Sequence, residues 1–337
     1  MQYRSLGKSP LQVSTLCLGT MMFGDQTDEA ESARIVASAR EAGVNFIDTA
    51  DVYSKGASET LLGKLLAGQR HDWVLATKLG NAMSNRPNES RYSRLWMVRE
   101  VEASLKRLGT DHIDILYLHR DYAGLDLEEP LRALDDLVRA GKLRYWGLSN
   151  FRGWRIAEAV HQARQIGMPQ PVVCQPYYNL LNRGPETDIL PACKFHGLGV
   201  VPFSPIARGV LTGKYAPGEV PPADTRAGRA DRRMMQTEFR PESLTIAQQV
   251  ARHAESRGIT PAQFATAWVL AHEAVSSVIA GPRTLAQWQA YLPAADWALT
   301  PEDEAVIDAL VTPGHPSTPG FNDPAYLWTN QRPRAAG

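Results

Sequence analysis

The sequence predicts an α/β protein whose strands close into a (β/α)8 TIM barrel, with an N-terminal hairpin and a C-terminal extension. Eight short, apolar, strand-like runs alternate with helical patterns, which indicates parallel strands joined by helical crossovers. No glycine-rich dinucleotide fingerprint follows an early strand, and even Gly197-Leu198-Gly199 lacks the third glycine, which disfavours a doubly wound sheet. Polar side chains close several of the strand-like runs, as expected where a barrel places its reacting groups.

Length and charge agree with one large domain and exclude some classes of partner. The chain has 337 residues and no linker separates the strand-like runs, so we expect a single domain over residues 1–337. Lys plus Arg and Asp plus Glu both number 36, and a formal charge of zero gives no indication of a nucleic-acid or anionic-membrane partner. The sequence leaves the oligomeric state open.

The cysteines and the apolar runs indicate the compartment. Cys17, Cys174 and Cys193 are too few and too scattered for a disulfide framework or a structural zinc site. The first residues lack the apolar core of a signal peptide, and no apolar run approaches the roughly 20 residues needed to span a bilayer. No cluster of His and carboxylate residues has the spacing of metal ligands. We therefore expect a soluble cytoplasmic protein without a metal.

The first half of the chain supplies the hairpin and four strands. Residues 1–15 are typical of a hairpin that turns around Gly7. Asp28 is expected to cap the first helix, with Glu31 in the capping-box position and Gly43 just past the end. The expected strands are 16–20, 44–47, 73–78 and 113–119, and the expected helices are 28–42, 58–66 and 92–108.

The second half repeats the pattern with one interruption. Residues 204–240 form a long irregular stretch, and loops of this length are uncommon unless they are functional or disordered. Residues 313–337 form a proline-rich tail. The expected strands are 143–149, 172–175, 199–203 and 277–280, and the expected helices are 127–140, 155–166, 186–195, 242–257, 262–272, one from 284, and 301–310.

Four polar side chains stand at the ends of three successive strands. Asp48 and Tyr53 follow the second strand-like run, Lys78 ends the third and His119 ends the fourth. A tyrosine has a pKa of ~10, and a nearby ammonium makes loss of its proton easier. A buried ammonium in turn needs an anion. We expect Tyr53 to donate a proton, Lys78 to tune it, Asp48 to pair with Lys78, and His119 to orient a carbonyl or assist proton transfer.

Each of these residues also has an ordinary interpretation. Taken alone, Asp48 is typical of a turn or helix cap, and Tyr53 is typical of a half-buried core phenol. Lys78 would face solvent, and His119 would be a structural histidine with satisfied hydrogen bonds. Their joint placement at successive strand ends favours the chemical interpretation.

The later strand ends carry groups suited to a cofactor. A proton donor without a nucleophile or a metal suggests addition of hydride to a carbonyl, which needs a cofactor. Ser149, Asn150 and Gln175 follow the fifth and sixth strands and suit a nicotinamide carboxamide, while Phe203 and Ser204 offer an aromatic face and a hydroxyl. Residues 281–284 stand at a helix start, where backbone N–H groups favour a phosphate.

These residues together resemble the aldo-keto reductase superfamily. Asp48, Tyr53, Lys78 and His119 are similar to its catalytic tetrad in order and local context, and segments 146–151, 175–181 and 203–214 resemble its bacterial branches. The resemblance covers residues 1 to about 312. It implies NADPH extended across the barrel top, with NADH not excluded.

The resemblance also implies contacts for each part of the cofactor. Tyr291 stands where relatives often carry asparagine, which leaves the adenine contacts and the preference for NADPH over NADH open. The implied contacts are Ser149, Asn150 and Gln175 for the carboxamide, Phe203 for the nicotinamide ring, Ser204, Leu211 and Lys214 for the pyrophosphate, and Gly281, Arg283 and Gln287 for the adenosine phosphate end.

The expected function is NADPH-dependent reduction of an aldehyde or ketone to the alcohol. Physiological oxidation of an alcohol is one alternative. The other is a cofactor-sensing binding subunit that resembles the β-subunits of potassium channels, and the intact tetrad argues against it. The sequence does not identify the substrate.

Two further segments have two interpretations each, and the tail has one. The arginines at 226–233 are interpreted as a solvated loop, with a lid over the pyrophosphate as the alternative. Residues 21–23 either line the substrate pocket or pack at the edge of the core. The tail aromatics Phe321, Tyr326 and Trp328 are expected to fold over the substrate.

Overall fold

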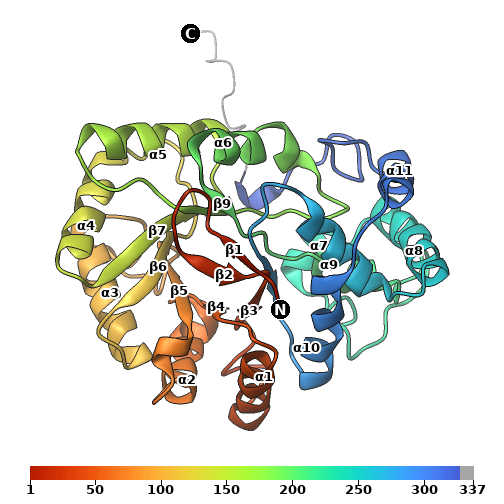
Figure 1. Cartoon of the computed structure of the whole chain (residues 1–337), viewed down its shortest axis with the longest axis horizontal. Coiled ribbons are helices and arrows are strands. Elements are labelled where there is room, and N and C mark those ends of the chain that lie inside the picture. Colours follow the sequence, from red (N-terminus) through yellow and green to blue (C-terminus); the bar gives the residue numbers. More distant parts are fainter. Residues whose placement is uncertain (327–337) are drawn as a thin grey trace.

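The computed structural model of the protein describes residues 1–326 and contains a ring of parallel strands surrounded by helices (Figure 1). The eight strands pair in the order β10-β3-β4-β5-β6-β7-β8-β9, so neighbours in the sheet are also neighbours in the chain. The strands are β3 (Leu16–Gly19), β4 (Phe46–Asp48), β5 (Val74–Leu79), β6 (Ile113–Leu118), β7 (Leu143–Ser149), β8 (Val173–Gln175), β9 (Gly199–Val200) and β10 (Val278–Ala280).

The ring closes between β9 and the segment that leads into β10. Val200 and Val275 form a parallel bridge, and Ser276 N donates to Val200 O at 2.9 Å. Ile279 N donates to Pro202 O at 3.0 Å, one step further along both segments. The last strand in the pairing order, β9, is thereby joined to the first, β10, and the ring is closed. The predicted (β/α)8 barrel is confirmed.

Helices cover the outside of the ring, as Figure 1 shows. The helices are α1 (Glu29–Glu41), α2 (Ala57–Leu65), α3 (Arg94–Leu108), α4 (Glu128–Arg139), α5 (Gly153–Gln165), α6 (Ile189–His196), α7 (Arg232–Thr237), α8 (Pro241–Ser256), α9 (Pro261–Ala271), α10 (Leu285–Tyr291) and α11 (Pro301–Leu310). Short 3-10 turns lie at Tyr53–Gly56, Arg70–Asp72, Gly184–Thr187, Ala207–Thr212, Leu292–Asp296 and Pro324–Tyr326.

Two apolar cores follow from the alternation of side chains along the strands. The outer core lies between the strands and the helices, and the inner core fills the barrel. The inner core holds alternate strand residues together with Leu6 and Val13, and its members are Leu6, Val13, Cys17, Phe46, Ala76, Ile115, Tyr117, Val173, Val201 and Ile279. Cys174 is buried in the outer core.

The N-terminal hairpin seals the amino end of the barrel. Strands β1 (Tyr3–Ser5) and β2 (Gln12–Ser14) pair antiparallel, and in Figure 1 they lie across the centre of the ring. Lys8 N donates to Gly197 O at 2.9 Å, and a Cβ at Gly7 would lie 2.2 Å from the same oxygen. Only glycine allows this close approach at a φ of +57°. The carboxyl ends of the strands therefore form the open end.

Some expected boundaries are wrong for identifiable reasons. The Asp28 cap is present, with Glu31 N at 2.8 Å from Asp28 Oδ1, but Glu31 accepts from Leu285 N at 2.6 Å instead of closing a capping box. The helix expected at 186–195 is divided at Asp188, whose carboxylate accepts from Gly153 N at 3.0 Å. The stretch 204–240 contains a 3-10 turn and α7.

Candidate active site

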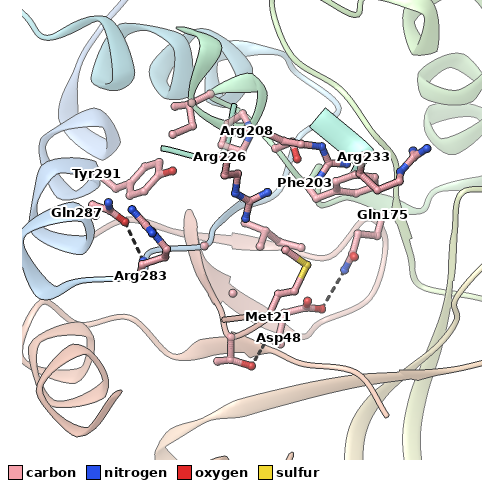
Figure 2. A pocket seen from close by; sticks show the side chains of 18 of the residues that line it. Met21, Asp48, Gln175, Phe203, Arg208, Arg226, Arg233, Arg283, Gln287 and Tyr291 are labelled. Carbon is pink, nitrogen blue, oxygen red and sulfur yellow. Dashed lines mark hydrogen bonds between the residues drawn. The ribbon is translucent and has the colours of Figure 1, made fainter. Parts of the chain in front are cut away.

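A cavity of about 430 Å³ opens at the carboxyl end of the strands (Figure 2). Strand ends and the loops that follow them supply its walls, as a barrel of this kind predicts. Its lining includes Gly19, Thr20, Met21, Asp48, Tyr53, His119, Ser149, Asn150, Gln175, Phe203, Ser204, Arg208, Lys214, Arg226, Arg233, Gly281, Arg283, Gln287, Tyr291 and Tyr326.

Lys78 lies directly beneath the cavity and is fully buried. Its Nζ donates to Asp48 Oδ1 at 2.5 Å, to Thr49 O at 2.7 Å and to Tyr53 Oη at 3.2 Å. These bonds use all three donors of an ammonium. The lysine therefore has one position, fixed by a carboxylate and a carbonyl, from which it contacts the phenol.

The chain after β4 brings Tyr53 back over Lys78. Thr49 N donates to Ala76 O at 2.9 Å and Asp51 N to Lys78 O at 3.1 Å, so this segment continues to follow β5. Tyr53 then opens a short turn in which Ser54 and Lys55 have left-handed φ angles of 49° and 54°. The turn ends the path along β5 and leaves the phenol facing the cavity.

The electrostatics of this cluster come mainly from burial. Burial raises the pKa of Tyr53 above its ordinary value, and Lys78 opposes that shift without cancelling it. Lys78 thus acts in the expected direction, but the phenol still keeps its proton at neutral pH. Burial alone would lower the pKa of Lys78, yet Asp48 and Tyr53 outweigh it and raise that pKa, so the ammonium stays charged.

His119 borders the same part of the cavity. Its ring centroid lies 6.0 Å from that of Tyr53, with the two planes at 80°. Burial, assisted by the charges of Lys78 and Arg120, lowers the pKa of His119 well below its ordinary value. A neutral imidazole can donate at one nitrogen and accept at the other, so this ring can orient a carbonyl oxygen.

Three polar side chains from β7 and β8 connect to the cluster. Gln175 Nε2 donates to Asp48 Oδ2 at 2.9 Å, and Ser149 Oγ donates to Gln175 O at 2.9 Å. Asn150 has a φ of 61°, and its Nδ2 donates to His119 O at 2.9 Å. The ends of strands β4 to β8 are therefore linked by hydrogen bonds across the cavity floor.

The residues expected at the cofactor phosphates divide into two groups. Ser204, Lys214, Gly281, Arg283 and Gln287 all line the cavity. Leu211 does not, because its side chain is fully buried in the outer core behind the turn. The sequence places Leu211 in this turn, but only the tertiary structure shows which side of the turn its side chain faces.

The loop arginines were only partly anticipated. Arg229 and Arg232 are exposed, as expected for a solvated loop. The same expectation is wrong for Arg226 and Arg233, which line the cavity (Figure 2). Arg226 Nη2 reaches Met22 Sδ at 3.8 Å, and burial lowers the pKa of Arg226. Apart from the length of the loop, no sequence signal distinguishes these arginines from their neighbours.

The cavity fits a ligand that carries phosphates. Lys214, Arg226 and Arg283 line it, and no Asp or Glu within residues 1–326 forms an ion pair with any of them. Arg283 N donates to Gln287 Oε1 at 2.8 Å at the start of α10 (Figure 2). Arg226 and Arg283 are half-buried and Lys214 is exposed, and half-buried cations without anions are costly until an anion binds. The phosphates of a dinucleotide cofactor would supply such anions.

The tail forms part of the cavity wall. Tyr326 lines the cavity, with the guanidinium carbons of Arg120 and Arg233 at 5.2 and 5.9 Å from its ring centroid. Arg233 Nη2 pairs with Asp323 Oδ2 at 2.5 Å. Phe321 packs under Arg240 instead, with the guanidinium carbon 3.7 Å from its ring centroid. Trp328 lies outside the described residues.

Residues 21–23 were expected either to line the substrate pocket or to pack at the edge of the core, and the structure shows both. Met21 is 39% exposed and lines the cavity, whereas Met22 and Phe23 are buried. Met21 is thus the member of this segment available to a ligand.

Comparison with known proteins agrees with the geometry of the cavity. The model of the aldo/keto reductase family matches residues 15–312. The chain belongs to the aldo/keto reductase family. Among similar proteins, a probable voltage-gated potassium channel subunit beta of Arabidopsis thaliana is 38% identical over 88% of this chain and 92% of its own length.

Two further relatives of this aldo/keto reductase have similar coverage. A protein of the same name from Oryza sativa subsp. japonica is 37% identical over 92% of this chain and 97% of its own length. The uncharacterized oxidoreductase YrpG of Bacillus subtilis is 37% identical over 97% of this chain and 100% of its own length. Family and relatives together make this protein an oxidoreductase.

Residues 1–326 lack two kinds of feature. No group of three or more His, Cys, Asp or Glu side chains there could hold a metal ion. None of the helices in the same part of the chain is both long enough and apolar enough to cross a membrane.

Proposed function

We propose that this aldo/keto reductase reduces an aldehyde or ketone to the alcohol with NADPH, and that Tyr53 donates the proton. The observation that carries the proposal is the contact of Tyr53 Oη with the buried Lys78 Nζ at 3.2 Å, while Asp48 holds the lysine from the other side. When bound, NADPH would supply the hydride to the carbonyl carbon.

The residues of the chain account for the proton. The raised pKa of Tyr53, caused mainly by burial, keeps the phenol protonated until the carbonyl oxygen gains negative charge. After the proton leaves, the phenolate is stabilised by the Lys78 ammonium, whose own pKa Asp48 helps to raise. His119, as a neutral imidazole, orients the carbonyl oxygen next to Tyr53.

The remaining lining residues would hold the cofactor. Ser149, Asn150 and Gln175 would bind the carboxamide, and Phe203 would stack on the nicotinamide ring. Ser204, Lys214 and Arg226 would bind the pyrophosphate, and Gly281, Arg283 and Gln287 would bind the adenosine phosphate end. An extra phosphate on the ribose is attracted by unpaired arginines, which supports NADPH rather than NADH.

The direct test measures NADPH consumption with aldehydes, ketones and quinones. Positioned acid–base groups contribute about 10²- to 10⁴-fold, so Tyr53→Phe should lower kcat by that factor. NADPH binding to Tyr53→Phe, followed by fluorescence, is the control and should be unchanged. Wild-type rates in Tyr53→Phe would refute the assigned role.

The names of two relatives favour a second candidate, a cofactor-sensing subunit that binds a membrane partner. Stoichiometric NADPH without turnover of any carbonyl, together with a co-purifying membrane protein, would support that candidate. The complete set of Asp48, Tyr53, Lys78 and His119 around the cavity supports the enzyme. Rates with both oxidised and reduced cofactor would establish whether alcohol oxidation is the favoured direction. We propose a cytoplasmic location for either activity.

A further inference from the structure

The turn that carries Tyr53 is strained, and its two ends are fixed by different parts of the molecule. Ser54 and Lys55 have left-handed φ angles of 49° and 54°, and Gly56 follows with a φ of +89°. Left-handed conformations are costly for residues other than glycine and persist where the surrounding structure imposes them. At one end of the turn, Tyr53 bonds to Lys78. The other end, Gly56, lies against a residue of α3 that does not line the cavity.

That residue is Arg107, which is enclosed between two glycines. Helices α2 and α3 pack side by side, as Figure 1 shows. A Cβ at Gly56 would lie 2.8 Å from Arg107 Cδ, and a Cβ at Gly63 in α2 would lie 2.6 Å from Arg107 O. Only glycine at both positions allows the arginine to lie this close to the turn and to α2.

The guanidinium of Arg107 binds two buried carboxylates. Its Nε donates to Glu59 Oε2 at 2.7 Å, and its Nη2 donates to Glu100 Oε1 at 2.5 Å. Glu59 is fully buried, and its other oxygen accepts from Thr77 Oγ1 at 2.6 Å. Thr77 immediately precedes Lys78 on β5. A continuous series of hydrogen bonds therefore connects Arg107, through Glu59, to the strand that carries Lys78.

Asp51 adds a third buried carboxyl group to this cluster. It lies two residues before Tyr53, and its Oδ2 has no hydrogen-bond partner within residues 1–326. Burial, together with the charges of Glu100 and Glu59, raises the pKa of Asp51 well above its ordinary value, and Arg107 opposes that shift. In the described part of the chain, Arg107 is the one cation that forms an ion pair with Glu59 or Glu100. Its removal would leave two carboxylates buried without a cation behind the Tyr53 turn.

The surroundings of the cluster indicate that it fixes geometry. The elements α2, α3 and β5 otherwise pack through the apolar side chains of the outer core. A buried ion pair is often no more stabilising than apolar side chains of similar volume. Charge-assisted hydrogen bonds, in contrast to apolar contacts, have a defined direction. The Arg107 pairs are therefore better explained by the position that they impose on the turn than by a gain in stability.

We propose that Arg107 is a positioning residue for the proton donor. It holds Glu59 and Gly56 in place, and the turn fixed in this way keeps the phenol of Tyr53 on Lys78. The inference rests on the proposed proton donation by Tyr53, and it adds a residue outside the cavity on which that step depends.

Two variants disrupt the pair, and a third removes a comparable pair elsewhere on the same strands. Arg107→Met removes the cation. Glu59→Gln keeps the size of the side chain and an acceptor for Thr77, but its amide nitrogen cannot accept from Arg107. Arg70→Met is the matched control, because the half-buried Arg70 pairs with Asp114 Oδ2 at 2.6 Å near the amino ends of β5 and β6.

Arg107→Met and Glu59→Gln should lower kcat about ten- to a hundredfold, because a displaced phenol meets the carbonyl in the wrong geometry. The KM of the carbonyl and the Kd of NADPH should stay within about twofold of the wild type, since neither residue lines the cavity. Arg70→Met should change only the resistance to urea. Wild-type kcat in Arg107→Met, or an equal loss of kcat in Arg70→Met, would overturn the proposal.

A neutral form of the cluster separates positioning from stability. Arg107→Met combined with Glu59→Gln and Glu100→Gln leaves no unpaired buried carboxylate in the cluster, so its urea midpoint should return close to the wild-type value. Its kcat should remain as low as that of Arg107→Met. Recovery of both the midpoint and kcat would assign the pairs to stability alone and overturn the proposal.

Hydrogen exchange separates the positioning role from the proposed function, because it needs no turnover. The backbone N–H groups of residues 53–57 should exchange at least about tenfold faster in Arg107→Met than in the wild type, and Arg70→Met should not change them. If no carbonyl is reduced but exchange in this segment depends on Arg107, the reductase function fails and the positioning role stands. Unchanged exchange of residues 53–57 in Arg107→Met would refute the positioning role.

Discussion

The cavity contains two regions that differ in whether the protein itself neutralises their charged side chains. In the Tyr53 region, Lys78 is fully buried and bonded to Asp48, Thr49 and Tyr53. In the region lined by Lys214, Arg226 and Arg283, the cations have no carboxylate partner within residues 1–326. The first region is complete in the protein alone. The second becomes neutral only when an anion binds.

The difference follows from the cost of burying charge. A fully buried ammonium must have its partner in the folded protein, because water cannot solvate it. Arginines and lysines at an open cavity remain partly hydrated, so leaving them without an anion until a ligand binds costs less free energy. Substitutions in the first region should therefore affect turnover and stability together, and substitutions in the second should affect ligand affinity alone.

The largest expected effect tests the first half of this comparison. Lys78→Met leaves Asp48 buried without a cation, so the free energy of unfolding should fall by about 3–5 kcal/mol. The rate of carbonyl reduction should fall about 10²- to 10⁴-fold. Lys78→Met combined with Asp48→Asn should regain most of the stability but none of the activity, as measured by urea unfolding and NADPH oxidation. If Lys78→Met were inactive but as stable as the wild type, the assumption that the buried Asp48 needs a cation would be contradicted.

Asp48→Asn should have a smaller effect that depends on pH. Without the carboxylate, burial would lower the pKa of Lys78, so the ammonium would be lost at a lower pH than in the wild type. The alkaline limb of the kcat profile should therefore move to lower pH, with a rate about ten- to a hundredfold lower at neutral pH. A profile that coincides with the wild type would show that Asp48 does not act through Lys78.

Arg226→Gln addresses the second region. Loss of a charge-assisted hydrogen bond should raise the Kd of NADPH about ten- to a hundredfold and make binding less sensitive to salt. The melting temperature without cofactor should not change, because Arg226 has no carboxylate partner among the described residues. Arg229→Gln, at an exposed position, is the matched control. A large loss of stability in Arg226→Gln would remove the distinction between the two regions.

The smallest expected effect concerns His119. Burial lowers the pKa of His119 in the folded protein. The unfolded chain therefore binds a proton at this histidine near pH 6.5, and the folded protein does not. Stability should therefore fall as the pH decreases below about 6.5, by about 1.4 kcal/mol per pH unit for this one proton. His119→Gln should have a smaller slope in urea unfolding between about pH 6.5 and pH 5. Equal slopes for His119→Gln and the wild type would mean that His119 is already protonated in the folded protein over this pH range.

The sequence alone was enough to predict the barrel and to locate the polar groups at its open end. Short apolar runs separated by helical patterns require parallel strands with crossovers, and a barrel then brings all the carboxyl ends of those strands together. Each of five polar residues lies at or next to the carboxyl end of a strand, so their meeting point follows from local patterns: Asp48, Lys78, His119, Ser149 and Gln175. The structure adds the bonds among them and shows that burial outweighs Lys78 in setting the pKa of Tyr53.

Only the tertiary structure decided the destinations of loop and tail side chains. Arg226 reaches Met22, and Arg233 reaches Asp323, across long separations in the chain that leave no periodic signal. Leu211 turns into the core although Gly209 and Thr212 of the same turn line the cavity. A strand constrains its side chains to two faces, whereas a loop residue is placed by whichever distant segment it contacts. The meeting of the polar groups at the open end was therefore predictable from the sequence, and the positions of the loop and tail side chains around them were not.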